Sequence, residues 1–264
     1  MAFIEVENVG KTFHPGIVAL KGVCLQIEEG EVVSILGPSG SGKSTLVRCI
    51  NGLETPTTGR VLVDGIEVNR KNLRQVRGQV GMVFQRFNLI PRLNVLSNVL
   101  VGRLAHRSWL TSTLGWFPAA DHELAHAALA EVKLLDRIWD RADKLSGGQQ
   151  QRVGIARTLV QQARVILADE PVASLDPTTS HEIMRLLVKV VKLRSATVVV
   201  NLHQVELAKK YTKRIIGLRA GELIFDLPAD QVTDYELAEL YGKSGLESEA
   251  TDILSTPENA VALC

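Results

Sequence analysis

Residues 37–45 have the sequence Gly-Pro-Ser-Gly-Ser-Gly-Lys-Ser-Thr, and no other stretch constrains this chain as strongly. An apolar run rich in β-branched residues, from Glu31 to Leu36, precedes it and is typical of a buried strand. Closely spaced glycines let the backbone curl so that its N–H groups point inward at an anion. We expect a helix to begin near Lys43. Its N-terminus would add the positive end of the helix dipole, which also favours a bound anion. The order strand, glycine-rich loop, helix predicts a phosphate-binding site.

Individual positions of this loop have distinct predicted roles. The Lys43 ammonium would reach the β- and γ-phosphates of ATP, and the Ser44 hydroxyl would ligate Mg²⁺. We expect the whole loop to contact the nucleotide, through Gly37, Pro38, Ser39, Gly40, Ser41, Gly42, Lys43, Ser44 and Thr45. ATP and Mg²⁺ are therefore the predicted ligands.

A pair of carboxylates follows a second apolar run. Val165 to Ala168 ends in Asp169-Glu170, and the carboxyl ends of parallel strands form the usual ligand edge of a sheet. Asp169 suits the Mg²⁺ shell, and Glu170 suits orienting or deprotonating an attacking water. Taken alone, such a pair is more often an exposed turn, so the prediction depends on the phosphate loop that precedes it.

Residues 145–149, Leu-Ser-Gly-Gly-Gln, add a second glycine-rich helix start. With this pentapeptide the sequence resembles the ABC-type ATPases that power ABC transporters, over nearly the whole chain from Phe3 to Tyr241. The motifs occur in the family's order. Further matches are an aromatic residue, a glutamine after a strand, a D-loop and a histidine, at Phe13, Gln85, residues 174–176 and His203.

The resemblance implies roles for these residues. Phe13 would stack on adenine, where the family usually has tyrosine, and stacking needs only a π-face. Gln85 would join the Mg²⁺ shell and the catalytic group, His203 would sense the γ-phosphate, and Ser146 and Gly148 would contact the γ-phosphate held by a second subunit. The alternatives are a core phenylalanine in a small sheet, a solvated strand end at Gln85 and a satisfied core histidine at His203.

The predicted fold is α/β: a P-loop NTPase parallel sheet flanked by helices, an antiparallel β layer and an inserted helical subdomain. Residues 1–242 would form a single ABC ATPase cassette, with the helical subdomain at about 86–157 and a polar tail at 243–264. The parallel strands are predicted at 31–36, 80–84, 165–169 and 197–202, and the antiparallel layer at 3–36 with 60–68. A helix is expected over 178–193, and the helical subdomain's apolar stripe is expected at Leu124, Ala128, Val132 and Leu135.

Composition excludes several classes of protein. The formal net charge is +1, without an evident basic stripe, so a nucleic-acid partner is not expected. No apolar run reaches the ~18 residues of a membrane span, and the N-terminus lacks the features of a secretory signal. Three scattered cysteines, Cys24, Cys49 and Cys264, favour reduced thiols over a disulfide framework.

Finer features resemble the ATP-binding subunits of bacterial phosphonate and phosphite importers. They are an aromatic loop (Trp109, Leu114, Trp116, Phe117, Pro118), the signature Ser-Gly-Gly-Gln-Gln-Gln-Arg-Val and the segment Leu-His-Gln-Val-Glu-Leu-Ala. The resemblance implies a second copy of the chain, two transmembrane permease subunits, an extracytoplasmic binding protein and a peripheral site on the cytoplasmic face of the inner membrane. An exporter or other importer ATPase remains an alternative. So does a soluble ABC ATPase, although no coiled-coil insertion lies between Lys43 and Asp169.

The resemblance also implies a docking groove for the permease after the Q-loop glutamine. The matching stretch is about Gln85 to Arg103, which is apolar apart from flanking arginines. An amphipathic helix of the partner would bind in such a groove. We expect the anchoring contacts at Phe87 and Leu89, with Ile90, Pro91 and Leu93 beside them.

Overall fold

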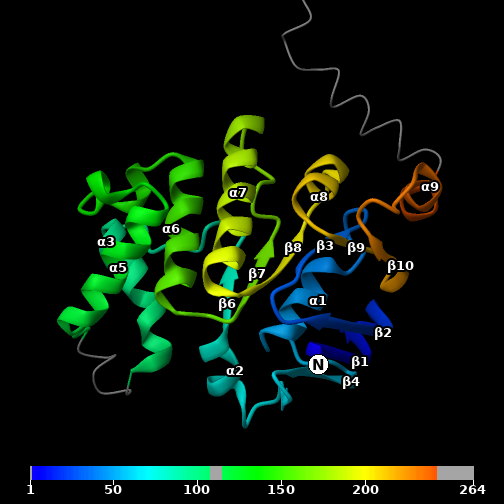
Figure 1. The fold of residues 1–264 in the computed structure, drawn as a ribbon. Coiled ribbons are helices and arrows are strands. Elements are labelled where there is room, and N and C mark those ends of the chain that lie inside the picture. Colours follow the sequence, from blue (N-terminus) through cyan, green and yellow to red (C-terminus); the bar gives the residue numbers. More distant parts are fainter. Residues whose placement is uncertain (1, 108–114, 243–264) are drawn as a thin grey trace, which may run out of the picture.

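The computed structural model describes residues 2–107 and 115–242. These residues form two sheets with one helix between them and a set of helices on the outer face of the larger sheet (Figure 1). The fold is the predicted α/β architecture.

The larger sheet has six strands, and its register sets the geometry of the site. Five strands run parallel and the sixth pairs antiparallel at one edge, in the order β10 (Glu222–Pro228), β9 (Arg214–Arg219), β3 (Val32–Leu36), β8 (Thr197–Asn201), β7 (Val165–Asp169), β6 (Val80–Val83). The four parallel strands expected from the sequence are confirmed as β3, β6, β7 and β8. The hairpin of β9 and β10 was not anticipated: both residues of its Ala220-Gly221 turn have positive φ, but alanine is not among the residues that mark such a turn in a sequence.

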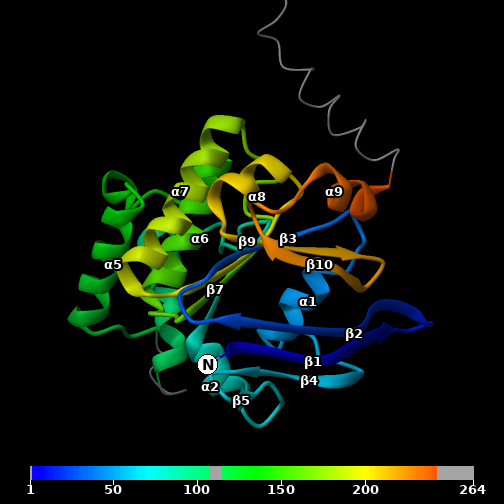
Figure 2. The same cartoon turned by 45° about the vertical axis from the view of Figure 1, so that its right-hand side comes forward.

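The smaller sheet is antiparallel, as expected. Its order is β2 (Ile17–Glu28), β1 (Ala2–Phe13), β4 (Thr58–Val63), β5 (Ile66–Glu67). Helix α1 (Lys43–Ile50) lies between this layer and the larger sheet, and it buries Leu46, Val47 and Ile50 in their shared core (Figure 2).

Each central strand of the larger sheet has both faces buried. In β7, Val165 and Leu167 face the α1 core, whereas Ile166 and Ala168 face the helices on the other side. This alternation follows the two-residue period of a strand, and continuous apolar runs are what a doubly covered parallel sheet requires. The rigid strands thereby fix the residues at their carboxyl ends.

The remaining helices follow the sheets in chain order. A short helix, α2 (Leu73–Gln79), leads into β6. The helical part contains α3 (Val95–Leu100), η1 (Val101–His106), α5 (Ala119–Glu131), η2 (Leu135–Arg137), η3 (Ala142–Lys144) and α6 (Gly147–Val160). Three more helices complete the fold, α7 (Pro177–Arg194), α8 (Val205–Tyr211) and α9 (Asp234–Tyr241). Helix α7 confirms the helix expected over 178–193.

One detail of the helical part was wrong. The predicted apolar stripe continued to Leu135, but α5 ends at Glu131 and the chain turns at Lys133, whose φ is 58°. The turn places Leu134 in the core and leaves Leu135 47% exposed. Trp109 and Leu114 of the aromatic loop lie outside the described residues. Of the others, Phe117 packs on the core and Trp116 is exposed.

Candidate nucleotide-binding site

The phosphate loop connects β3 to α1, and its glycines meet geometric demands that other residues would fail. Gly42 has φ 105°, and a Cβ there would lie 2.4 Å from the Ala19 carbonyl oxygen. At Gly37 a Cβ would lie 2.0 Å from the Leu218 carbonyl oxygen. The loop is therefore pressed between the start of β2 and the end of β9. No side chain caps the α1 N-terminus, which leaves its backbone donors available to an anion.

Lys43 lies buried beneath this loop. Its Nζ donates to the carbonyl oxygens of Gly37 at 2.6 Å and Pro38 at 3.0 Å. Burial lowers the pKa of the Lys43 ammonium, and the nearby negative charges of Glu170 and Asp169 partly oppose that shift. An anionic phosphate oxygen would be a stronger hydrogen-bond acceptor for this ammonium than the two carbonyl oxygens that it now contacts.

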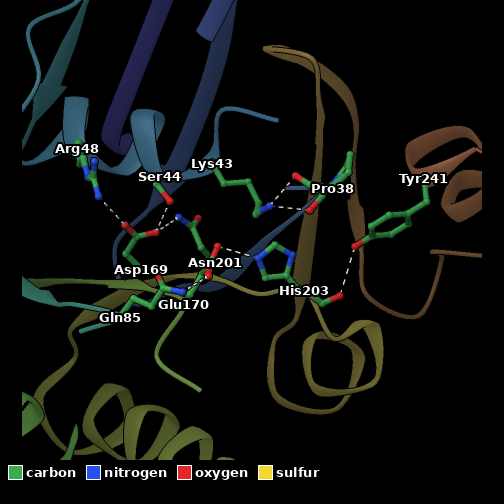
Figure 3. A network of polar contacts seen from close by, with 11 residues as sticks. Pro38, Lys43, Ser44, Arg48, Gln85, Asp169, Glu170, Asn201, His203 and Tyr241 are labelled. Carbon is green, nitrogen blue, oxygen red and sulfur yellow. Dashed lines mark hydrogen bonds and ion pairs between the residues drawn. The ribbon is translucent and has the colours of Figure 1, made fainter. Parts of the chain in front are cut away.

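Asp169, at the carboxyl end of β7, contacts several polar side chains (Figure 3). Its Oδ1 accepts from Ser44 Oγ at 2.7 Å and from Asn201 Nδ2 at 2.8 Å. Arg48, one helical turn after Ser44, approaches Oδ2 at 3.8 Å. The Ser44 hydroxyl and the Asp169 carboxylate are hard oxygen donors side by side, the type of ligand that Mg²⁺ prefers. The described residues contain no cluster of three or more His, Cys, Asp or Glu suited to a metal.

Glu170 is held from two sides. Gln85 Nε2 donates to its Oε2 at 2.7 Å, and His203 Nε2 lies 2.7 Å from its Oε1. Glu170 also has φ 50°, an uncommon value for a residue other than glycine. Gln85 is exposed, but it is more than a solvated strand end, because its amide is bonded to the Glu170 carboxylate. His203 is half-buried and is therefore not a core histidine.

The other predicted contacts lie on separate elements. Phe13 ends β1, partly exposed and outside both hydrophobic cores of the described chain, with Lys11 Nζ 4.8 Å from its ring centroid. Ser146 is the N-cap of α6 and forms a capping box with Gln149. Within the described chain its side chain joins none of the contacts around Asp169 and Glu170. Gly148 packs on α7, where a Cβ would lie 2.6 Å from Thr179 Cγ2.

The loop after Gln85 is tied to the helix that carries Ser146. Phe87 and Asn88 both have positive φ, and their carbonyl oxygens accept from Arg157 of α6, at 3.2 and 2.6 Å respectively. Burial lowers the pKa of the Arg157 guanidinium from its ordinary value, yet such a group stays charged at neutral pH. A displacement of the loop would therefore reach α6 directly.

Asn201 and Arg48 are contacts of Asp169 that the sequence analysis missed. Asn201 ends the apolar strand β8 and pairs in register with Asp169. A polar residue at the same sheet edge as the two carboxylates was a usable signal. Arg48 offered no such signal, because its position depends on the path of α1.

Comparison with known proteins places this arrangement in a family. The ABC transporter family profile matches residues 20–173. This chain belongs to the ABC transporter family. It is an ATPase cassette of that family, and the predicted fold is confirmed. No described helix is long and apolar enough to cross a membrane.

Curated relatives and solved structures resemble the cassette over most of its length. The phosphonates import ATP-binding protein PhnC of Thiobacillus denitrificans is 53% identical over 95% of this chain and 97% of the relative. PhnC 2 of Trichodesmium erythraeum is 52% identical over 86% and 87%. A dimeric post-hydrolysis structure of the ATP-binding cassette MJ0796 with ADP and Pi has a TM-score of 0.76 and 39% identity, and covers 86% of this chain and 98% of that one.

Proposed function

We propose that this cassette hydrolyses ATP at an interface between two copies of itself and thereby energises import of phosphonate or a related phosphorus oxyanion. One observation carries the proposal: the chain shares 53% identity, over nearly its whole length, with a protein named for phosphonate import. Residues 1–242 would act as the single cassette. The proposal that it hydrolyses ATP is supported by Glu170, which Gln85 and His203 hold in place near the phosphate loop.

The phosphate loop would hold the triphosphate. Backbone N–H groups of residues 37–45 and the α1 N-terminus would donate to the phosphate oxygens, and Lys43 would exchange its two carbonyl acceptors for the β- and γ-phosphates. Mg²⁺, held by Ser44, Asp169 and Gln85, would neutralise charge on the β- and γ-phosphates. Phe13 would stack on the adenine.

Glu170 would act as the general base toward the attacking water. Gln85 and His203 fix its two oxygens, so the carboxylate is oriented before the water arrives, which is how a positioned base is most effective. His203 would also contact the γ-phosphate. Binding of that phosphate would then affect both residues that hold Glu170, Gln85 through the Mg²⁺ and His203 directly.

A second copy would complete each site. Ser146 and Gly148 lie at the start of α6, partly or fully exposed, and form no hydrogen bond with the phosphate loop of their own described chain. Their helix N-terminus suits the γ-phosphate held by the partner subunit. Nucleotide binding would close the pair, and hydrolysis would open it.

Two permease subunits would receive this motion, with an extracytoplasmic binding protein supplying the transported anion. The cassette would therefore lie on the cytoplasmic face of the membrane. The stretch after Gln85 is our candidate contact, and side-chain exposure favours Ile90 and Leu93 over the partly buried Phe87 and Leu89 as its anchors. Leu89 packs on the core, whereas Ile90 and Leu93 are 48% and 38% exposed. Buried Asn98 holds both, bonding to the Ile90 N–H at 2.7 Å and the Leu93 carbonyl at 3.3 Å.

The test is transport in reconstituted vesicles containing the cassette, its permease and the binding protein. We expect ATP-dependent uptake of a phosphonate that requires the binding protein, together with substrate-stimulated ATPase activity. Efflux in place of uptake would assign the cassette to an exporter. ATPase activity that no membrane partner influences would favour a soluble ABC ATPase.

A further inference from the structure

The near-neutral total charge of the chain conceals a strongly basic segment, so the expectation that the chain has no basic stripe was wrong. Residues 68–120 contain eight arginines and lysines and no aspartate or glutamate. The whole chain has 30 Lys and Arg against 29 Asp and Glu, so the remainder holds 22 against 29 and is net −7. The eight cations are Arg70, Lys71, Arg74, Arg77, Arg86, Arg92, Arg103 and Arg107.

The structure gathers the first four of these cations, with Arg107, around one hollow. The hollow has a volume of about 620 Å³ and lies between α2 and η1, which pack on each other. Helix α2 lies at the lower edge of the molecule in Figure 1, outside the nucleotide site. A hollow lined by this many cations suits a ligand with several negative charges.

Four of the five cations have no acidic partner. Arg70, Lys71, Arg74 and Arg77 form no ion pair with any described residue; Arg107 does, bonding to buried Asp121 at 2.9 Å. Arg77 instead donates to the Gly52 carbonyl at 2.8 Å, and Arg74 donates to the Arg107 carbonyl at 2.8 Å. Those backbone contacts hold two guanidinium groups in place without neutralising them.

Apolar side chains interleave with these charges. Leu73 and Leu104 line the same hollow, and Leu104 is exposed. Leu53, also exposed, follows the glycine whose carbonyl Arg77 holds. Exposed leucines among lysines and arginines are typical of surfaces that rest in a bilayer interface. A nucleic-acid site of the same charge would favour aromatic stacking residues over leucines.

We propose that this basic hollow, formed by Arg70, Lys71, Arg74 and Arg77, binds the phosphate headgroups of anionic membrane lipids. The inference rests on the proposed function in one respect, since a cassette that drives a permease works against the membrane surface. Anionic leaflets attract basic segments, and the leucines would enter the headgroup layer beside the phosphates. The contact would orient the cassette independently of the permease.

Flotation of the purified chain with lipid vesicles tests the inference without any permease. Vesicles of phosphatidylcholine alone are compared with vesicles containing about one-third phosphatidylglycerol. We expect binding only to the anionic vesicles, and release as salt rises from about 0.1 M to about 1 M and the Debye length falls from ~10 to ~3 Å.

Matched variants locate the contact. Arg70→Gln, Lys71→Gln and Arg74→Gln together should weaken anionic-vesicle binding by on the order of 100-fold, since each such cation near the surface contributes about five-fold. The control changes three exposed lysines elsewhere, Lys209→Gln, Lys210→Gln and Lys213→Gln, and should bind as the parent chain does. Unchanged thermal unfolding and ATPase activity in solution show that both variants fold.

Four outcomes overturn the inference. They are equal binding to neutral vesicles, equal loss in the control variant, full competition by millimolar inorganic phosphate, which indicates a free-anion site, and tighter binding of a homopolymer RNA, which indicates a nucleic-acid surface. Failure of the proposed function is separable. A chain that floats with anionic vesicles but neither hydrolyses ATP nor supports uptake overturns the transport proposal and leaves the lipid contact standing.

Discussion

Glu170 Oε1 lies 2.7 Å from His203 Nε2, although 33 residues separate them in the chain. The register of two strands produces this contact: Asp169 of β7 pairs with Asn201 of β8, Glu170 follows Asp169 directly, and His203 lies two residues after Asn201. Glu170 also has a positive φ, of 50°, at the point where the chain leaves β7. Sheet pairing, and not local sequence, therefore joins the proposed base to the proposed phosphate sensor.

The first prediction concerns Glu170→Gln. The amide keeps the shape of the carboxylate but cannot accept a proton, and general-base catalysis is worth about 10² to 10⁴ in rate. The phosphate loop is untouched, so ATP binding should persist and the protein should accumulate as an ATP-bound dimer on gel filtration. Single-turnover hydrolysis measures the loss.

Asp226→Asn is a suitable comparison, because Asp226 is paired with Arg214 on the far edge of the sheet. It should retain turnover within a few fold. Near-normal turnover in Glu170→Gln would assign the base to another residue.

A second prediction tests the shared site. Ser146→Arg should abolish ATPase activity, because a long cation at the α6 start would obstruct the partner's nucleotide, while ATP binding by the monomer should survive. Ser146 also caps α6, and loss of such a cap costs about 1 kcal/mol. Ser146→Ala is therefore the matched control: it removes the same cap without added bulk.

We expect both variants to show a similar decrease in thermal stability. Ser146→Ala, which also loses the hydroxyl contact to the partner's γ-phosphate, should keep reduced activity that still rises with protein concentration, whereas the arginine variant should lose activity and that rise. A concentration-independent rate in the parent chain would contradict the two-chain model.

Much of this architecture could be predicted from the sequence because its signals are local. The phosphate loop, the four parallel strands and α7 follow from glycine spacing, apolar runs and a proline at a helix start. Leu135 was misplaced because a left-handed turn at Lys133, a residue without an obvious preference for it, shifts the buried position to Leu134. Asn201 and Arg48 depend on strand register and helix path, which no single segment specifies.

A third prediction concerns the two described cysteines. Cys49 lies fully buried in the α1 core, whereas Cys24 is exposed and its sulfur accepts from the Asn8 N–H. Cys49→Ser would bury a hydroxyl among apolar side chains and should lower the free energy of unfolding by about 1–3 kcal/mol. Cys24→Ser should change it by less than about 0.5 kcal/mol. Urea denaturation measures both, and turnover should stay within a few fold in each case.

Cys49 also predicts a pH dependence. Burial raises the pKa of its thiol from 9.0 to about 11. Below pH 9 the thiol is protonated in both folded and unfolded chains, so its contribution to stability is complete there. Between pH 9 and pH 11 only the unfolded chain gains thiolate, so stability is lost. The difference in unfolding free energy between the parent chain and Cys49→Ala should shrink over this interval, and a constant difference would contradict the raised pKa.

The last prediction concerns the proposed permease contact. Ile90 and Leu93 are exposed and fixed by Asn98, so aspartate at either position should leave the fold intact and remove an apolar anchor. Leu89 packs on the core, and Leu89→Asp should instead destabilise the whole cassette by burying a charge.

We therefore expect Ile90→Asp and Leu93→Asp to retain ATP binding and thermal stability but to lose co-purification with the permease and substrate-stimulated ATPase activity. Leu193→Asp is the matched control, because Leu193 is also exposed, at 62%, but lies on α7, outside the stretch that follows Gln85. It should co-purify normally. If Ile90→Asp and Leu93→Asp still co-purify and still couple uptake to hydrolysis, the permease docks elsewhere, and the order imposed by Asn98 serves only the packing of the helical part.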